Sequence, residues 1–253
     1  MFEEAQGLFN SMLMNSDIQY RMQRLKNKDP IRDKNKYFEM THYNHLGRGL
    51  SLEDNDLIQL SLSDCFLDIA CEYLGEEPKV RNILGWLMGE CSFPRNFSQT
   101  WHRDTEGEKV LKVWMYFSDV DKTTGAADYV VKSCKGKRND YIWYNLVNEK
   151  REWPGESGYL SPQAASQIPA EDIVTASGKR GTLIFADTNG FHRGGYVLEG
   201  FRASTHTVYL RSDAREIVEG PITHFNYNPK VNYCDFDSSK FINLSERQKA
   251  CLL

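Results

Sequence analysis

The chain has 253 residues, of which 40% are hydrophobic and 26% charged, and its formal net charge is −4 at pH 7. This size and balance are typical of a globular protein with a sizeable core, and the net charge gives no electrostatic reason to expect a nucleic-acid partner. The N-terminus lacks the basic start and apolar core of a signal peptide, and no run approaches the roughly 18 apolar residues of a membrane span. The 6 cysteines form no C-x-x-C pair, which favours reduced thiols. We therefore expect a soluble, cytoplasmic protein without a membrane partner; the sequence leaves its oligomeric state open.

Helical signals dominate the first third of the chain. Hydrophobic residues recur at helical spacing between 51 and 75, where Ser51 is a candidate N-terminal cap and Gly75 a candidate stop. A weaker helix is expected over residues 2–26, followed by connecting chain with a short strand at about 36–42.

Short β-like runs then follow, separated by turn signals such as DKTTG and DTNG. The runs cover residues 80–87, 97–102, 110–117, 127–131, 181–186 and 202–211. Their spacing predicts an antiparallel barrel or sandwich rather than a parallel sheet. The stretch 140–170 is aromatic and rich in Pro and Gly, and its length is typical of a functional loop or lid. Packing of this loop onto the barrel explains its composition equally well.

The sequence QTWHRDTEG, residues 99–107, places His102 and Asp104 one residue apart in a predicted strand. Because residues i and i+2 of a strand point to the same side, the two side chains would converge while Arg103 points away. Such a tripeptide alone more often forms a surface ion pair than a metal site. His192 lies at the far end of the β region, and two histidines with one carboxylate form the facial triad of non-haem iron(II) oxygenases.

Arg202 opens a run in which alternate residues, including Ser204 and His206, share one face. A buried guanidinium needs an anion, and its planar fork matches a carboxylate. A dicarboxylate co-substrate would chelate the metal at one end and pair with Arg202 at the other. Gln99 shares the face of the ligands by alternation, so it would reach the co-substrate or the substrate.

Over residues 80–212 the sequence resembles the phytanoyl-CoA dioxygenase family of iron(II)- and 2-oxoglutarate-dependent oxygenases. The resemblance rests on QTWHRD, LKVWMYFSDVD, GAADYVVKSCKG and GTLIFADTNGFHRGG…GFR. It implies a mainly β fold with flanking helices, a double-stranded β-helix also described as a cupin-like jelly-roll barrel. Residues 1–253 would form a single oxygenase domain. Its parts would be a helical region 1–78, a barrel core 80–212 with an insertion or lid at 140–170, and a C-terminal tail 213–253.

By this resemblance His102, Asp104 and His192 match the catalytic iron ligands, and Arg202 matches the arginine that binds the far carboxylate of 2-oxoglutarate. Trp114 matches a tryptophan position that lines the co-substrate pocket. Some family members carry a serine at the position of Gly194, so the second contact to the co-substrate would come from Ser204, His206 or Trp114.

The implied activity is the oxidation of a C–H bond of a small molecule by O2, with Fe(II) as cofactor and 2-oxoglutarate as co-substrate, releasing succinate and CO2. Family relatives that halogenate resemble this pattern with a small residue in place of Asp104. The carboxylate therefore favours hydroxylation, desaturation, ring closure or epoxidation. Natural products, amino-acid derivatives, sugar-linked metabolites and acyl derivatives are all candidate substrates.

Two other classes of function remain open. In the first, the barrel is a binding module that holds a metal or ligand without turnover. In the second, it is a cupin-like enzyme that uses its ion as a Lewis acid. Arg202 discriminates between them, because only a carboxylate co-substrate explains its placement. For the remaining candidates we favour structural roles: a hydrogen-bonded His206, surface or packing roles for His42 and His45, a place in a C-terminal loop for His224, and a solvated loop around Lys132, Lys135, Lys137 and Arg138.

Overall fold

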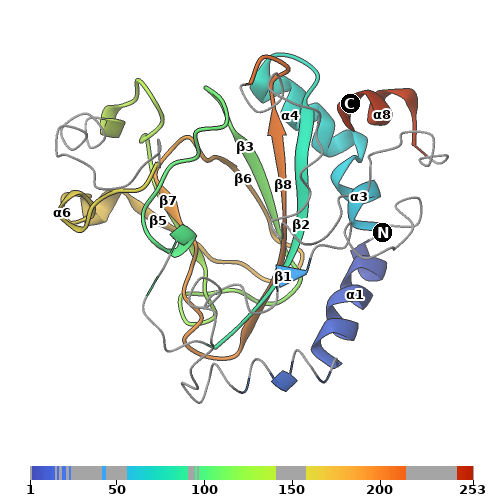
Figure 1. Ribbon diagram of the computed structural model, residues 1–253, viewed down its shortest axis with the longest axis horizontal. Coiled ribbons are helices and arrows are strands. Elements are labelled where there is room, and N and C mark those ends of the chain that lie inside the picture. The colour runs from blue at the N-terminus through green and yellow to red at the C-terminus, as the bar shows by residue number, and fades with distance from the viewer. Residues whose placement is uncertain are drawn as a thin grey trace, which may run out of the picture.

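The structure, a computed structural model, consists of two antiparallel sheets that face each other, with most helices on one side (Figure 1). It describes residues 2–14, 16, 19–20, 23, 42–43, 56–90, 95, 97–140, 158–214 and 244–252. The larger sheet has the spatial order β1 (His42–Tyr43), β2 (Lys79–Gly89), β8 (Phe201–Leu210), β3 (Leu111–Tyr116) and β6 (Leu183–Asp187). The smaller sheet has the order β5 (Ile173–Ala176), β4 (Ala127–Val130) and β7 (His192–Arg193).

Successive segments of the chain alternate between the two sheets. After β2 in the larger sheet, His102 bridges to β7 in the smaller one, and β3 returns to the larger sheet. The strands β4 and β5 then lie in the smaller sheet, β6 in the larger, β7 in the smaller and β8 in the larger. This winding is that of a double-stranded β-helix, so the predicted mainly β, jelly-roll fold is confirmed.

The main hydrophobic core lies between the larger sheet and the helices on its outer side (Figure 1). The helices there are α1 (Phe2–Met14), α3 (Asp56–Ser61), α4 (Asp64–Leu74) and α8 (Glu246–Leu252), whereas the short α6 (Pro162–Ala165) lies beside the smaller sheet. Leu111, Val113 and Met115 of β3 belong to this core together with Leu67 of α4. Because side chains alternate across a strand, the residues between them face the other way, toward the smaller sheet. This inner face of the barrel carries the polar residues described below.

A single helix is predicted over residues 51–75. In the part of this range that the structure describes, two separate helices, α3 and α4, are present. The chain breaks after α3 because the Ser63 hydroxyl and amide both donate to the Leu60 carbonyl, which gives the backbone an alternative to helical pairing. The predicted stop at Gly75 is confirmed, since Gly75 adopts the left-handed conformation with φ of 83° and its amide donates to Cys71. The predicted cap at Ser51 lies outside the described residues.

The predicted strands at 80–87, 110–117, 127–131, 181–186 and 202–211 correspond to β2, β3, β4, β6 and β8. The predicted strand at 97–102 is wrong in its first half, where Phe97–Gln99 forms the 3-10 turn η4. Its partner β7 is only two residues long, so the ladder has a place for His102 alone, and the Ser98 carbonyl instead accepts the amide of Gly194. The strand β5 was not predicted.

The described end of the 140–170 insertion, residues 158–170, packs against the barrel. Its residues Leu160, Ala165 and Ile168 join a second hydrophobic cluster with Trp101 and Phe191. The division of the chain into one domain with a lid and a tail stays a prediction, because 141–157 and 215–243 lie outside the described part.

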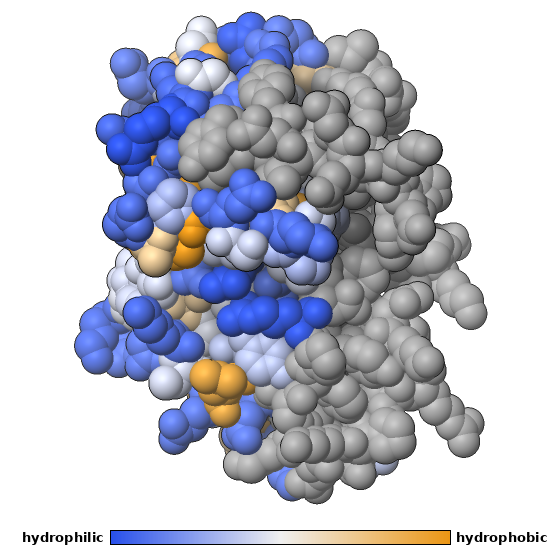
Figure 2. Space-filling model, turned by 90° about the vertical axis from the view of Figure 1, so that its left-hand side faces the viewer, coloured by the Kyte–Doolittle hydropathy of each residue, from blue (hydrophilic) through white to orange (hydrophobic). Residues whose placement is uncertain are grey.

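The described part of the face in Figure 2 is mainly hydrophilic, with hydrophobic residues as isolated spots. Scattered apolar residues of this kind are ordinary for a protein surface. Among the described helices, none combines the length and apolar character that crossing a membrane requires.

Replacing Leu67 with alanine should test the packing of α4 on the larger sheet. The side chain is fully buried, so we expect the free energy of unfolding to fall by about 2–5 kcal/mol in urea denaturation. Leu198, which is 61% exposed, is the matched control, and its replacement by alanine should change the same quantity by less than about 0.5 kcal/mol. Equal losses at both positions would contradict this arrangement of the core.

Candidate metal centre

Three side chains with metal-ligating atoms meet inside the barrel: His102, Asp104 and His192. Their ligand atoms all lie within 4.8 Å of one another. Asp104 Oδ1 is 3.9 Å from His102 Nε2, and Asp104 Oδ2 is 3.5 Å from His192 Nε2. These separations are too long for hydrogen bonds, and they suit atoms arranged around a common centre.

The backbone fixes the positions of all three residues. His102 and His192 exchange both of their backbone hydrogen bonds, at 2.9 and 2.8 Å, as an antiparallel pair. The amide of Asp104 donates to the carbonyl of Thr188 at 2.8 Å, which holds the carboxylate beside them. The imidazoles are therefore opposite each other across the ladder, with ring centroids 4.2 Å apart.

Each imidazole is oriented by a backbone carbonyl at its Nδ1 atom. His102 Nδ1 lies 2.8 Å from the Thr100 carbonyl oxygen, and His192 Nδ1 lies 3.0 Å from that of Gly190. Because a carbonyl oxygen only accepts, the proton of each neutral ring is on Nδ1 and the lone pair is on Nε2, which faces Asp104. Carbonyl acceptors orient metal-ligating histidines in this way.

The electrostatics of the site keep these three side chains in the protonation states that metal binding would require. Burial lowers the pKa of His102, and burial together with the neighbouring His102 lowers the pKa of His192 to about 3. Burial alone would raise the pKa of Asp104, but the Lys112 ammonium and the two imidazoles outweigh it and hold that pKa well below its usual range. At neutral pH both imidazoles are thus neutral and the carboxylate is ionised.

Lys112 is a neighbour of the site that sequence reasoning missed. Its Nζ atom lies 2.6 Å from Asp104 Oδ2, and their side chains are only 13% and 12% exposed. The alternation on β3 that turns Trp114 inward also turns Lys112 inward, so this signal was present in the sequence.

The inner face continues along β3 and β8 from the triad to Arg202. Trp114 on β3 has its ring centroid 6.2 Å from that of His192, and it is opposite His206 on β8. Two residues further along β3, Tyr116 is opposite Ser204, which lies two residues from Arg202 on the same face of β8. The inner face thus joins the triad and Arg202 by way of Trp114 and Ser204.

Arg202 is half-buried and has no carboxylate partner among the described residues. One terminal nitrogen donates to the Gly125 carbonyl, the other lies 2.7 Å from Met88 Sδ, and the enclosed Nε has no hydrogen-bond partner. Burial lowers the pKa of this guanidinium. A desolvated cation with an unused donor is a site where an anion would be stabilised.

The other candidate residues do not contribute atoms to the triad, and their positions are as follows. Gln99 is buried at the end of η4, so the strand alternation that predicted its direction does not apply. His45 and His224 lie outside the described residues, and of His42 only the backbone, in β1, is described. In the predicted basic loop, Arg138 pairs with Asp172. Tyr159, at the end of the insertion, stacks on His102 with ring centroids 5.0 Å apart.

Arg103 points away from the triad, as predicted, and its contacts hold in place the ligand segment, residues 102–104. Its Nη2 donates to Ser133 and to Asp140, at 2.8 and 3.0 Å, and its guanidinium lies 4.4 Å above the Phe191 ring. Its amide donates to the Gly158 carbonyl at 2.9 Å, so the end of the insertion lies against the ligand segment. A side chain on Gly158 would have no room there, because a Cβ atom would lie 1.9 Å from the Arg103 carbonyl oxygen.

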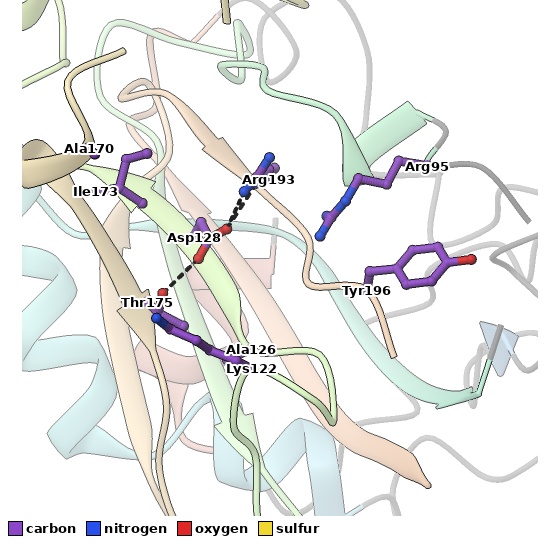
Figure 3. A pocket seen from close by; sticks show the side chains of 9 residues that line it. All are labelled: Arg95, Lys122, Ala126, Asp128, Ala170, Ile173, Thr175, Arg193 and Tyr196. Atoms are coloured by element: carbon purple, nitrogen blue, oxygen red, sulfur yellow. Dashed lines mark hydrogen bonds and ion pairs between the residues drawn. The ribbon is translucent and has the colours of Figure 1, made fainter. Parts of the chain in front are cut away.

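A pocket of about 350 Å³ lies on the other side of the smaller sheet (Figure 3). Asp128 on β4 accepts from Arg193 at 2.8 and 2.9 Å and from Thr175 at 2.8 Å, so its charge is largely neutralised. His192 and Arg193 are consecutive in β7 and point to opposite faces, which separates the pocket from the triad. The lining residues are Arg95, Lys122, Ala126, Asp128, Ala170, Ile173, Thr175, Arg193 and Tyr196.

Gly158→Ala should disturb the metal centre through the backbone of the ligand segment. The new methyl group has to displace Arg103, so we expect a loss of several kcal/mol in the free energy of unfolding and weaker binding of divalent metal. Gly7→Ala is the control, because Gly7 lies in α1 with open space around it and alanine stabilises a helix by about 1 kcal/mol. Unchanged stability and metal affinity in Gly158→Ala would contradict the close approach of the two segments.

No protein-family model matches the chain, and no curated protein matches it. Among solved structures it is similar to the non-heme alpha ketoglutarate dependent epimerase SnoN, with 18% identity and a TM-score of 0.42 over 61% of this chain and 55% of SnoN. For the non-heme alpha ketoglutarate dependent carbocyclase SnoK these values are 20% and 0.45, over 63% of this chain and 60% of SnoK. For EctD from S. alaskensis with bound Fe they are 15% and 0.46, over 79% of this chain and 70% of EctD.

The chain thus spans less than two thirds of the length of SnoN and SnoK. None of the three is named as a phytanoyl-CoA dioxygenase, so the resemblance to that family stays a prediction. Their TM-scores are all below 0.5, and the function of this chain is therefore argued from its own residues.

Proposed function

We propose that this chain is an iron(II)- and 2-oxoglutarate-dependent oxygenase that oxidises a C–H bond of a small molecule and releases succinate and CO2. The observation that carries the proposal is the pairing of two features on one inner face of the barrel. A His–Asp–His triad lies at one end, and the guanidinium of Arg202, without a carboxylate partner among the described residues, lies further along the same face.

The donor set fits iron(II). His102, His192 and Asp104 would hold the ion through two neutral nitrogens and one ionised oxygen, the donor set of non-haem iron(II) oxygenases. Iron(II) bound there would supply the coupling of 2-oxoglutarate decarboxylation to oxidation of the substrate by O2. The carboxylate of Asp104 fills the position that is opened for halide in the halogenating relatives, so hydroxylation or a related oxidation is proposed.

The environment of Arg202 fits the far carboxylate of 2-oxoglutarate. The guanidinium is desolvated and its Nε is an unused donor, so a carboxylate would gain charge-assisted hydrogen bonds there. Trp114 would form a wall of the co-substrate site between Arg202 and His192, and Ser204, on the Arg202 face of β8, would supply a second polar contact. Gln99 is proposed as a further contact.

The protein's own part in the reaction is to bind, orient and exclude water. The backbone pair of His102 and His192 fixes the two imidazoles before any ion arrives, and Tyr159 covers one face of the His102 ring. The barrel interior lowers the effective dielectric, which strengthens the pairing of Arg202 with an anion.

The substrate is proposed only as a small molecule, and the chain as a cytoplasmic member of the phytanoyl-CoA dioxygenase family. The described cysteines Cys65, Cys71, Cys134 and Cys251 are free thiols, as a reducing compartment requires. A pure binding module or a Lewis-acid enzyme would also use the triad, but neither accounts for an Arg202 guanidinium that has no carboxylate partner among the described residues.

Anaerobic titration of the metal-free protein with iron(II), and then with 2-oxoglutarate, tests the metal centre. We expect saturable iron binding, followed by the weak visible charge-transfer band of a 2-oxoglutarate chelate. In His192→Ala the iron affinity should fall by about 100-fold or more, because loss of a ligand exceeds the 10–100-fold effect of losing an outer partner. His206→Ala is the matched control and should keep its affinity. A wild type that folds but forms no band would overturn the oxygenase proposal.

Arg202→Met tests the carboxylate clamp separately. The dissociation constant of 2-oxoglutarate should rise by about 100-fold, which corresponds to the loss of two hydrogen bonds to a charged group. Iron affinity without 2-oxoglutarate should stay unchanged. Arg180→Met removes an exposed guanidinium that pairs with Glu3, and it should leave both constants as they are. Unaltered co-substrate affinity in Arg202→Met would favour the Lewis-acid alternative.

A further inference from the structure

Lys112 contacts the carboxylate of Asp104, which is proposed as a metal ligand. Its ammonium is therefore a positive charge beside the place where the metal ion would bind. The ammonium lies 2.6 Å from Asp104 Oδ2, and both side chains are nearly enclosed. Lys112 faces the barrel interior from β3, two residues before Trp114, so it belongs to the same inner face as the triad.

We propose that Lys112 is a positioning residue that substitutes for the charge of the metal: it holds the Asp104 carboxylate between the two imidazoles when no ion is bound, and it competes with the ion for that carboxylate. This inference rests on the proposed function, because it takes His102, Asp104 and His192 to be metal ligands.

The surroundings of Asp104 show why a cation is needed there. The two imidazole Nε2 atoms are 3.9 and 3.5 Å from its oxygens, and as neutral lone-pair acceptors they offer it no proton. Among the described residues, the cation in contact with Asp104 is Lys112. An enclosed carboxylate without a cation is strongly unfavourable, so removal of the ammonium would disfavour the assembled triad.

A divalent ion changes the balance of charge around Lys112. Once the ion binds Asp104, a positive charge lies close to the ammonium inside the barrel, where charges are weakly screened. Lys112 would therefore stabilise the metal-free protein and weaken its hold on the ion.

These two effects have opposite signs, which distinguishes the inference from a purely structural role. A lysine that only supports the fold would, when removed, lower stability and weaken metal binding together. A lysine that substitutes for the ion would, when removed, lower the stability of the metal-free protein and tighten metal binding.

The test uses Lys112→Met, which keeps the length of the side chain and removes its charge. Two quantities are measured: the thermal midpoint of the metal-free protein, and the dissociation constant of iron(II) under anaerobic conditions. We expect the midpoint to fall by several degrees and the iron(II) dissociation constant to fall about tenfold, because a like charge near the ion is removed. Lys179→Met is the matched control, since Lys179 forms an exposed ion pair with Asp119 at 2.8 Å, and it should change neither quantity.

A second variant keeps the test decisive if Lys112→Met is too unstable without metal. Adding Asp104→Asn removes the charge that needs Lys112, so the double variant should recover metal-free stability relative to Lys112→Met alone. Iron(II) should also restore the folded signal of an unstable Lys112→Met, and a variant that stays unfolded with iron would overturn the inference.

The inference and the proposed function fail in different ways. Iron(II) binding to the wild type with no gain of affinity in Lys112→Met would overturn the role of Lys112 alone. A folded wild type that binds no iron(II) would overturn the proposed function and the inference with it.

Discussion

The two backbone hydrogen bonds that His102 and His192 exchange are the constraint on which the site depends. They join segments from opposite ends of the β region, and they place both imidazoles on one side of the smaller sheet. Without a second strand opposite it, the segment around His102 would be a loop, and the direction of its side chains would be undetermined. The short length of β7 restricts this pairing to one residue of the ligand segment, and contacts from Arg103 and Gly158 hold the rest of it.

The two faces of the larger sheet have different roles: the outer face packs against the helices, and the inner face carries polar residues of the candidate site. Leu111, Val113 and Met115 of β3 pack against helices on the outside, while Lys112 and Trp114 face the triad on the inside. Strand alternation enforces this division, because a one-residue slip would exchange the two sets completely. Hydrophobic burial on the outer face thus fixes the register that brings polar groups together on the inner one.

Much of this arrangement could be predicted from the sequence, because it follows from local periodicity. The pairing of His102 with Asp104, the inward face of Arg202 and five of the predicted strands all rest on period-2 alternation. The strand predicted at 97–102 failed because its residues alternate well but β7 offers them no ladder partner beyond His102. The break at Ser63 depends on a hydroxyl that competes for a backbone carbonyl, which composition alone does not reveal. Alternation on β3 predicts that Lys112 faces inward, but its contact with Asp104 joins separate segments, and no sequence motif indicates such a contact.

The barrel interior holds the charges of Asp104, Lys112 and Arg202 in a region where charges are costly. Asp104 and Lys112 compensate each other, so together they demand no ligand. Among the described residues, the partners of Arg202 are a carbonyl and a thioether, and an apolar residue in its place would be less costly to the fold. Because the described residues place no carboxylate on this guanidinium, we propose that its anion comes from a bound co-substrate. In the proposed function, the triad and Arg202 bind the two ends of one co-substrate, and the register that builds the core also sets their separation along β3 and β8.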